Sequence, residues 1–274
     1  MARCVILLID GLRPDAVRPD LAPSLYALGR DYTRAETALT VRPSTTVAAL
    51  LSLATGVGPA THKLVEPGLA TLRKVGSLRP VPRELSARQL STVVVAGEVL
   101  PAEVPIAKVL ASAAGVGRFI ATAGPARRVA AAALGRLRFV PDGLVIVYVN
   151  DCDRVGHAAG WMSDPYLEAV READAAVAQL RACTADSLLV VLADHGGGGV
   201  HPTDHDTPHP ANDRIPLVLA GPRIRRRHVL RRPASLLDVP PTLMWWLGLE
   251  VPGSYEGRVL REAFVAADEL EAVA

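Results

Sequence analysis

Short apolar runs alternate along this chain with segments in which apolar residues recur at helical spacing. That alternation is typical of βαβ units, and it predicts an α/β fold with a mainly parallel central sheet and helices on both faces. The apolar runs predict strands at residues 3–9, 91–96, 118–122, 144–149, 187–193 and 215–220. The helical patterns predict helices at residues 22–30, 46–54, 104–114, 125–136, 165–182 and 234–247.

Proline and glycine indicate where elements begin and break. Pro165 suits the first turn of its helix, whereas Pro240 and Pro241 predict that the last helix is interrupted or restarted there. Residues 57–88 are rich in Gly, Pro and Arg, so we expect an irregular region or a short hairpin. Because no repeat, linker or shift in composition divides the chain, we expect a single domain over residues 1–274.

The composition indicates a cytoplasmic protein. Half of the residues are hydrophobic, but no stretch reaches the ~18–20 apolar residues of a membrane span. A predicted strand begins almost at Met1, with no sign of a secretory signal. Cys4, Cys152 and Cys183 are odd in number and far apart, which fits reduced thiols. We therefore expect a cytoplasmic location and no membrane partner.

The charge balance argues against a nucleic-acid partner. The chain has 30 basic and 28 acidic residues, a net charge of +2, whereas nucleic-acid-binding domains carry a clustered basic excess. One basic cluster, at residues 223–232, has two interpretations. It is either a solvated surface segment or an arginine patch that faces an anionic substrate or partner.

Acidic and histidine residues stand where three of the predicted strands end. Asp10 follows the first strand, Asp153 follows the fourth, and Asp194 and His195 follow the fifth, while Thr46 begins a predicted helix. Each residue alone has a structural alternative in turn formation. Ligands of α/β sheets bind at the carboxyl ends of the strands, however, and this combination of side chains is typical of a two-metal hydrolytic site.

The segments around these residues resemble the alkaline phosphatase superfamily, and within it the branch of nucleotide pyrophosphatases and phosphodiesterases. Their order and spacing make the resemblance specific, and it runs through most of the chain. The segments are VILLIDGLRPDAV, PSTTVAALLSLATGVGPATH, DCDRVGHAAG, LADHGGGGVHPTDHDTP, RIPLVLAGPRI and SLLDVPPTLMWWLGLEVPGSYEGRVL. The resemblance implies an alkaline-phosphatase-like catalytic domain with two divalent metal ions, zinc being common and manganese the alternative.

The resemblance also implies a threonine nucleophile. Thr46 lies ten residues before Gly56, where the family places this residue, and the adjacent hydroxyls of Ser44 and Thr45 are the alternatives. A threonine hydroxyl is a weak nucleophile near neutral pH, and coordination to a metal makes its alkoxide accessible. The N-terminus of a helix adds free N–H groups for the phosphoryl oxygens.

Position by position, the resemblance implies two sets of metal ligands. One metal is expected to bind Asp10, Thr46, Asp194 and His195, and the other Asp153, His157 and His205. His205 is reached by counting back from the proline of the next strand, and His201 or His209 could replace it or line the substrate pocket.

Substrate contacts are less well indicated. The backbone N–H of Val47 and the side chain of Lys63 are candidates. Ala49 stands where the resemblance implies an asparagine that donates to the phosphoryl group. We expect residues 57–140 to shape the substrate pocket.

The resemblance implies a phosphoric ester hydrolase with a small-molecule substrate, diesters being favoured, and a covalent phosphothreonine intermediate. A phosphomonoesterase, a phosphomutase and an inactive metal-binding relative are the alternatives. A sulfatase is disfavoured because Thr46 is followed by Val-Ala-Ala in place of the motif that is matured to formylglycine. The oligomeric state is not predicted.

Overall fold

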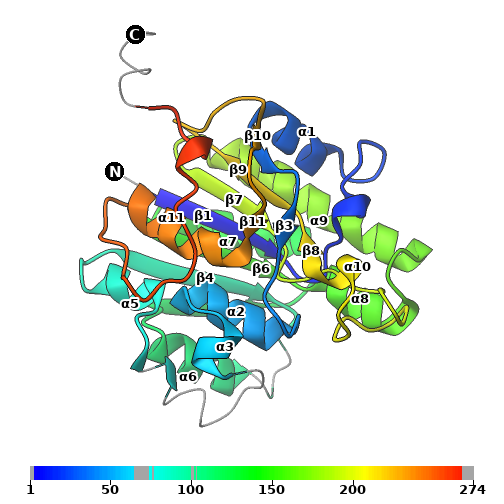
Figure 1. The fold of residues 1–274 in the computed structure, drawn as a ribbon, viewed down its shortest axis with the longest axis horizontal. Helices are drawn as coiled ribbons and strands as arrows, with labels where there is room; N and C mark the ends of the chain where they lie inside the picture. Colours follow the sequence, from blue (N-terminus) through cyan, green and yellow to red (C-terminus); the bar gives the residue numbers. More distant parts are fainter. Residues whose placement is uncertain (1–2, 65–73, 76, 100–101, 103, 267–274) are drawn as a thin grey trace.

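A mainly parallel sheet runs through the centre of the computed structural model, which describes residues 3–64, 74–75, 77–99, 102 and 104–266 (Figure 1). Eight strands form this sheet in the order β10-β2-β9-β7-β1-β6-β4-β5 within the described chain. Their bounds are β1 (Arg3–Ile9), β2 (Thr33–Ala35), β4 (Ser91–Gly97), β5 (Arg118–Thr122), β6 (Gly143–Val149), β7 (Leu188–Leu192), β9 (Leu217–Ala220) and β10 (His228–Leu230). A smaller sheet consists of β3 (Ala38–Leu39), β8 (Arg214–Ile215) and β11 (Ala234–Ser235). The predicted fold class is confirmed.

Burial on both faces explains why the central strands are continuous apolar runs. In β1 every residue after Arg3 is buried, and Ile6 lies opposite Ile146 of β6 and Val190 of β7. Because β6, β1 and β7 are parallel neighbours, their carboxyl ends lie at one edge of the sheet.

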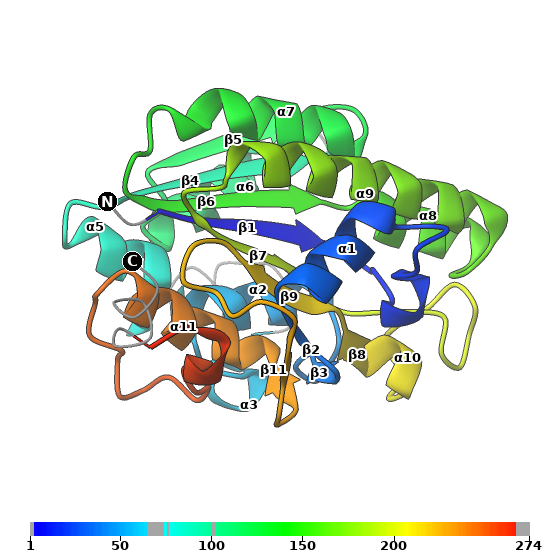
Figure 2. The ribbon, with the colours of Figure 1, turned by 90° about the horizontal axis from the view of Figure 1, so that it is seen from above.

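Helices cover both faces of the sheet (Figure 2). On one face lie α1 (Pro23–Asp31), α7 (Ala126–Leu137) and α9 (Asp164–Cys183), and α7 packs along α9. On the other face lie α2 (Thr46–Thr55) and α11 (Val239–Trp246). The remaining helical elements are α3 (Pro59–His62), α5 (Val81–Ser86), α6 (Val104–Ala113), α8 (Asp151–Ala159), α10 (Pro210–Asp213) and the 3-10 turns Pro14–Ala16, Leu236–Asp238 and Arg261–Ala263.

The predicted strands and long helices are present, with two differences in detail. The run over 215–220 is divided between β8 and β9, and β9 is antiparallel to both of its neighbours. Within 234–247 the helix begins only at Val239, so the two prolines stand in its first turn, where their missing N–H groups cost nothing.

A hairpin within residues 57–88 was a wrong alternative for the described part of that segment, because α3 and α5 occupy it. Each begins next to a proline, which suits a first helical turn. Residues 65–73 and 76 lie outside the described residues.

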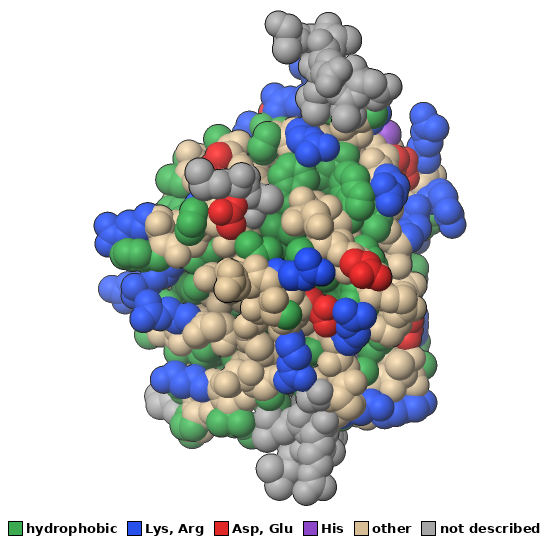
Figure 3. Space-filling model, turned by 90° about the vertical axis from the view of Figure 1, so that its left-hand side faces the viewer, with side chains coloured by type: hydrophobic (Ala, Val, Ile, Leu, Met, Phe, Trp, Pro, Cys, Tyr) green, Lys and Arg blue, Asp and Glu red, His purple; other side chains and the backbone are tan. Residues whose placement is uncertain are grey.

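On the face shown in Figure 3, lysine and arginine side chains are scattered among hydrophobic and polar ones. Within the basic cluster, Arg226 stacks over the ring of Tyr32 and Arg223 over Trp246. Some of its arginines therefore pack against aromatic rings. None of the described helices combines the length and hydrophobicity needed to cross a bilayer.

Candidate metal centre

The acids predicted at strand ends meet at the carboxyl edge of β6, β1 and β7. Asp10 directly follows β1, and Asp194 follows β7 after one residue. Gly11 adopts a φ of +68°, and a Cβ there would lie 2.8 Å from the Cα of Asp153. The close turn at this glycine brings the segment after β1 against the segment after β6.

Asp153 and His157 lie on α8, a helix that the sequence analysis did not predict. Its first turn carries Asp151 and Asp153, which suits the positive end of the helix dipole, and it ends before Gly160. Residues four apart share one face of a helix. Nε2 of His157 accordingly lies 3.4 Å from Oδ1 of Asp153.

Three carboxylate oxygens surround Nε2 of His195, which is fully buried. The distances are 3.2 Å to Oδ1 of Asp10, 3.5 Å to Oδ2 of Asp194 and 4.0 Å to Oδ1 of Asp153. Each of these oxygens is buried and lacks a hydrogen bond within the described part of the chain. Orphaned carboxylate oxygens of this kind call for a cation.

Backbone carbonyls orient all three imidazoles in the same way. Nδ1 donates to the carbonyl of Gly196 in His195 (2.8 Å), to that of Ser44 in His205 (2.8 Å) and to that of Thr203 in His157 (2.9 Å). A carbonyl only accepts, so Nδ1 carries the proton in the neutral ring and Nε2 is left free as a ligand. Such a contact is typical of histidines that bind metals.

The residues of both predicted ligand sets lie together, but His195 belongs to both groups. Ligand atoms of Asp10, Asp194 and His195 lie within 4.8 Å of one another, and so do those of Asp153, His195 and His205. His157 adjoins the second group, with its Nε2 3.1 Å from that of His205. The two ligand sets that were expected to be separate therefore share His195 in the structure.

The charges of the site shift one another's pKa values. Burial disfavours a charge on His195, but Asp194, Asp10 and Asp153 outweigh this and raise its pKa to about 10. Burial and the charge of Asp10 raise the pKa of Asp153 to about 6, and they raise that of Asp194 well above its usual value. Burial and the nearby His195 lower the pKa of His205 to about 4. Without a cation, the site is therefore an unfavourable concentration of negative charge.

Thr46 is the first residue of α2 and faces this cluster. Its Oγ1 lies 3.1 Å from Nε2 of His195. Thr45 is the N-cap in an extended conformation, and the first N–H groups of α2 lack partners within the helix. Ser44 instead donates its hydroxyl to the carbonyl of His205, whereas the hydroxyl of Thr46 contacts a candidate ligand imidazole.

The alternatives to His205 lie elsewhere. His201 is exposed, and Nδ1 of His209 accepts the N–H of Ala211 at the start of α10. Lys63 is exposed at the C-terminal end of α3, and Ala49 is buried in α2. The roles of Val47 and Lys63 toward substrate stay predictions.

Two aromatic residues that the sequence analysis missed support the cluster. Tyr148 donates its hydroxyl to Oδ2 of Asp10, and burial together with Asp10 raises its pKa well above 10, so the proton stays on the hydroxyl. Trp161 packs edge-on against His157, with ring centroids 5.1 Å apart, and donates to the carbonyl of Gly11. In the sequence both rings resemble ordinary apolar core positions, although Tyr148 stands one residue before the end of β6.

These residues fit a divalent metal ion. Mixed carboxylate and imidazole ligands suit zinc, manganese and related ions. Three observations support the fit. Carboxylate oxygens lack hydrogen-bond partners within the described residues, and backbone contacts at Nδ1 leave Nε2 of the histidines available as a ligand. The ligand atoms of each group also lie within 4.8 Å of one another.

Comparison with protein families gives two matches. Residues 108–251 match the Metalloenzyme superfamily, which is more than half of the chain. Residues 4–70 match the family of type I phosphodiesterases and nucleotide pyrophosphatases. The phosphodiesterase match contains Asp10 and Thr46, and the Metalloenzyme match contains the remaining predicted ligands.

Curated relatives include 2,3-bisphosphoglycerate-independent phosphoglycerate mutases. That of Rhodopirellula baltica is 34% identical over 136 residues, which cover 46% of this chain and 23% of the relative. That of Listeria monocytogenes is 27% identical over 125 residues, or 43% of this chain and 23% of the relative. The matched region thus spans about a quarter of these relatives' length.

Solved structures share the fold. A protein of the alkaline phosphatase superfamily from Vibrio parahaemolyticus has a TM-score of 0.74 at 18% identity and covers 98% of this chain and 71% of its own. The phosphonate monoester hydrolase of Silicibacter pomeroyi has a TM-score of 0.69 at 18% identity, with 98% and 78% covered.

Proposed function

Because the chain belongs to the Metalloenzyme superfamily, as its resemblance to alkaline phosphatases predicted, we propose that it is a metal-dependent phosphoric ester hydrolase with Thr46 as nucleophile. Phosphodiesters are the favoured substrates, since residues 4–70 match the phosphodiesterase family. The single observation that carries the proposal is the position of Thr46. Its hydroxyl stands at a helix N-terminus and 3.1 Å from a histidine that three orphaned carboxylate oxygens surround.

Two groups of residues would hold the metals, most simply zinc. Asp10, Asp194 and His195 form one group, and Asp153, His157 and His205 form the other, with His195 between them. When bound, two divalent ions supply Lewis acidity, which lowers the pKa of a coordinated hydroxyl and stabilises charge on the transferring phosphoryl group.

The chain's own residues position the reaction. Thr46 loses its hydroxyl proton and forms the bond from Oγ1 to phosphorus, while the bond from phosphorus to the leaving alcohol breaks. The free N–H groups of the first turn of α2, including that of Val47, donate to the phosphoryl oxygens. Water then cleaves the phosphothreonine, which restores the hydroxyl of Thr46 and releases a phosphomonoester.

A phosphomutase is the second candidate, and a specific observation favours it. The curated relatives are phosphoglycerate mutases, whose matched portion is about a quarter of their length. A mutase returns the phosphoryl group from the nucleophile to a second hydroxyl of the substrate, so it needs residues that retain the substrate.

Turnover of simple esters tests the proposal. Protein stripped with a chelator and reloaded with zinc or manganese should release nitrophenol from bis-nitrophenyl phosphate faster than from nitrophenyl phosphate. Interconversion of phosphoglycerate isomers without release of phosphate would favour the mutase instead. If the metal-loaded protein acts on none of these compounds, the enzymatic proposal is wrong and an inactive metal-binding relative is the remaining interpretation.

Substitution of the nucleophile gives the sharpest test. Thr46→Ala should lower kcat by about a thousandfold or more, because the covalent step is lost, and it should leave metal binding largely intact. Thr45→Ala is the matched control, since it removes a hydroxyl one residue away, and it should retain most activity. Full activity of Thr46→Ala, or equal losses in both variants, would assign the attack to another group.

A further inference from the structure

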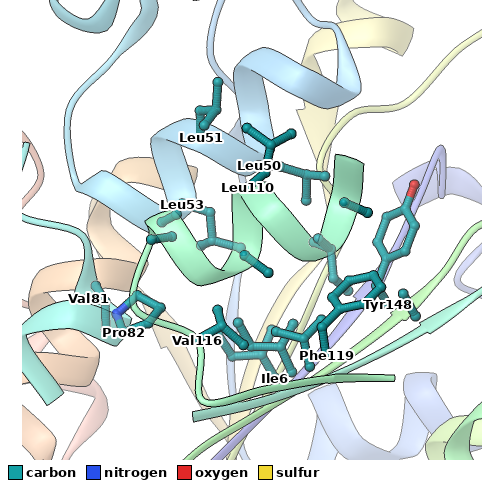
Figure 4. Close-up of a pocket in the computed structure, with 18 of the residues that line it drawn as sticks. Ile6, Leu50, Leu51, Leu53, Val81, Pro82, Leu110, Val116, Phe119 and Tyr148 are labelled. Carbon is teal, nitrogen blue, oxygen red and sulfur yellow. The ribbon is translucent and has the colours of Figure 1, made fainter. Parts of the chain in front are cut away.

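An apolar cavity of about 310 Å³ lies between the sheet and helices α2 and α6 (Figure 4). That volume is at the lower end of the ~300–1,000 Å³ typical of small-molecule sites. Its floor consists of alternate residues that point to one face of three neighbouring strands. These residues are Ile6 and Leu8 of β1, Val94 and Ala96 of β4, and Leu144, Ile146 and Tyr148 of β6.

The cavity adjoins the metal centre at one end. Tyr148 contributes its ring to the cavity wall (Figure 4), and its hydroxyl donates to Oδ2 of Asp10. Val47, the residue after Thr46, lines the same cavity from α2. From Leu144 to Tyr148 the strand advances by about 13 Å at ~3.3 Å per residue, so the cavity extends along the sheet away from the site.

The walls indicate what the cavity accepts. Among the described residues that line it, all side chains are aliphatic or aromatic, and apart from the tyrosine hydroxyl they offer no donor or acceptor for a sugar or a nucleobase. The helix α6 that forms one wall has no buried residue, although most of its residues are apolar. Within the described part of the chain, its inner face therefore has less apolar cover than a helix of this composition needs.

We propose that the cavity binds the apolar group of an amphiphilic phosphate ester, whose phosphoryl group lies at the metal centre. This inference rests on the proposed hydrolase function and names its substrate class: esters of long-chain or aryl alcohols. Tyr148 joins the cavity wall to Asp10, and Val47 follows the nucleophile, so the apolar lining lies beside the metal centre. This position selects the apolar group of the substrate over an unrelated protein segment.

Alkyl nitrophenyl phosphates with methyl, butyl and octyl chains test the inference. Burial of each methylene raises kcat/KM by up to about fourfold, and the octyl ester should exceed the methyl ester by about a hundredfold if part of the chain stays exposed. An octyl-to-methyl ratio near one would overturn the inference.

Two variants of α6 locate the effect. Ala111→Phe fills the cavity and should lower the octyl-to-methyl ratio by at least about tenfold. Val109→Phe adds a ring to the same helix at a residue that is 51% exposed and does not line the cavity, so it should keep the ratio. Ala54→Phe, which enters the cavity from α2, is the second filling variant if Ala111→Phe does not fold. Equal ratios in the filling and control variants would contradict the inference.

Binding separates this inference from the hydrolase proposal. Calorimetry should show that octyl phosphate binds the metal-loaded protein more tightly than methyl phosphate does, and that Ala111→Phe removes the difference. If no ester is hydrolysed but this preference holds, the hydrolase proposal fails and the cavity assignment survives. If the two phosphates bind equally, the cavity does not take the alkyl chain and the inference fails. If sedimentation shows that Ala111→Phe acts only by dissociating a dimer, a second copy of the chain covers the cavity, and the inference fails as well.

Discussion

His195 determines how the centre responds to pH, because three carboxylate oxygens hold a proton on it. Its pKa of about 10 means that the metal-free protein carries this proton at neutral pH. A metal that binds Nε2 displaces the proton, so affinity should rise with pH by about tenfold per unit for each proton displaced. The rise should end near pH 10.

Asp153 adds a second step to this dependence. Its pKa of about 6 means that it is also protonated below that pH, so the affinity should fall more steeply there. Calorimetric titration with manganese in buffers of different ionisation enthalpy measures both the affinity and the number of protons released. An affinity that is constant between pH 7 and 9 would contradict the protonated state of His195.

Tyr148 orients Asp10, and its loss should weaken the centre without unfolding the protein. Tyr148→Phe removes the hydroxyl that donates to Oδ2 of Asp10 and keeps the buried ring. Loss of a group that orients a metal ligand typically costs about 10- to 100-fold in affinity. Competition with a chelating dye measures this change. Tyr26→Phe, at an exposed tyrosine, is the control and should bind metal as the wild type does.

At the scale of elements, a buried carboxylate ties α1 to α9. Asp174 is buried on α9, and its two oxygens accept the N–H groups of Ser24 and Leu25 in the first turn of α1. No side chain of α1 provides this cap, since its N-cap is an alanine. Asp174 therefore satisfies N–H groups that would otherwise be left unpaired.

Asp174→Ala should lower the free energy of unfolding by about 1–3 kcal/mol, because two N–H groups of α1 lose their acceptor. Thermal unfolding followed by circular dichroism should show a Tm lower by several degrees. Glu168→Ala is the control on the same helix, since its ion pair with Arg171 is exposed and contributes about 0–1 kcal/mol. A loss no larger than that of the control would contradict the capping role.

The pattern of apolar residues predicted the strands and helices that form because they are buried in the core. It did not predict features that burial does not determine. Strands such as β1 and β6 are long apolar runs, so their positions were predictable. The direction of β9 was not, because periodicity carries no information on which way a strand runs. The short helix α8 was missed because its sequence DCDRVGHAA is mostly polar and small.

The same reasoning separates the predictable part of the centre from the rest. Strand ends indicated Asp10, Asp153, Asp194 and His195. The family resemblance added His157, His205 and the role of Thr46, and the structure brings these side chains together. The place of His195 between both groups depends on how α8 and the loop of His205 pack, which spacing does not reveal. The cavity beside α2 likewise depends on how α6 meets the sheet.

At the scale of the whole molecule, the centre should cost stability when it holds no metal. The protein is nearly neutral overall, with a net charge of +2, yet Asp10, Asp153 and Asp194 converge in one buried place. A ligand that binds only the folded state stabilises it, by about 2.7 kcal/mol at a concentration of 100 times its Kd. Metal removal should therefore lower Tm, and addition of zinc or manganese should restore it.

Asp153→Asn should be more stable than the wild type without metal and less stable than the wild type with metal. The pKa of Asp153 is raised in the folded protein, so its charged form disfavours folding, and this loss develops between pH 4 and 6 and persists above. Asparagine carries no charge, so the metal-free variant should unfold at a higher temperature than the metal-free wild type at pH 8, and the difference should vanish below pH 4.

With metal added at pH 8, the wild type should become the more stable of the two, because the variant has lost a carboxylate ligand. Scanning fluorimetry in chelator and in excess zinc measures all four Tm values. If the variant unfolds at the lower temperature in chelator, Asp153 stabilises the fold directly. If both proteins gain equally from zinc, the carboxylate is not a ligand. Either result would separate the charge cluster from the metal centre, whereas the expected inversion can arise only if the same carboxylate disfavours the empty site and holds the ion.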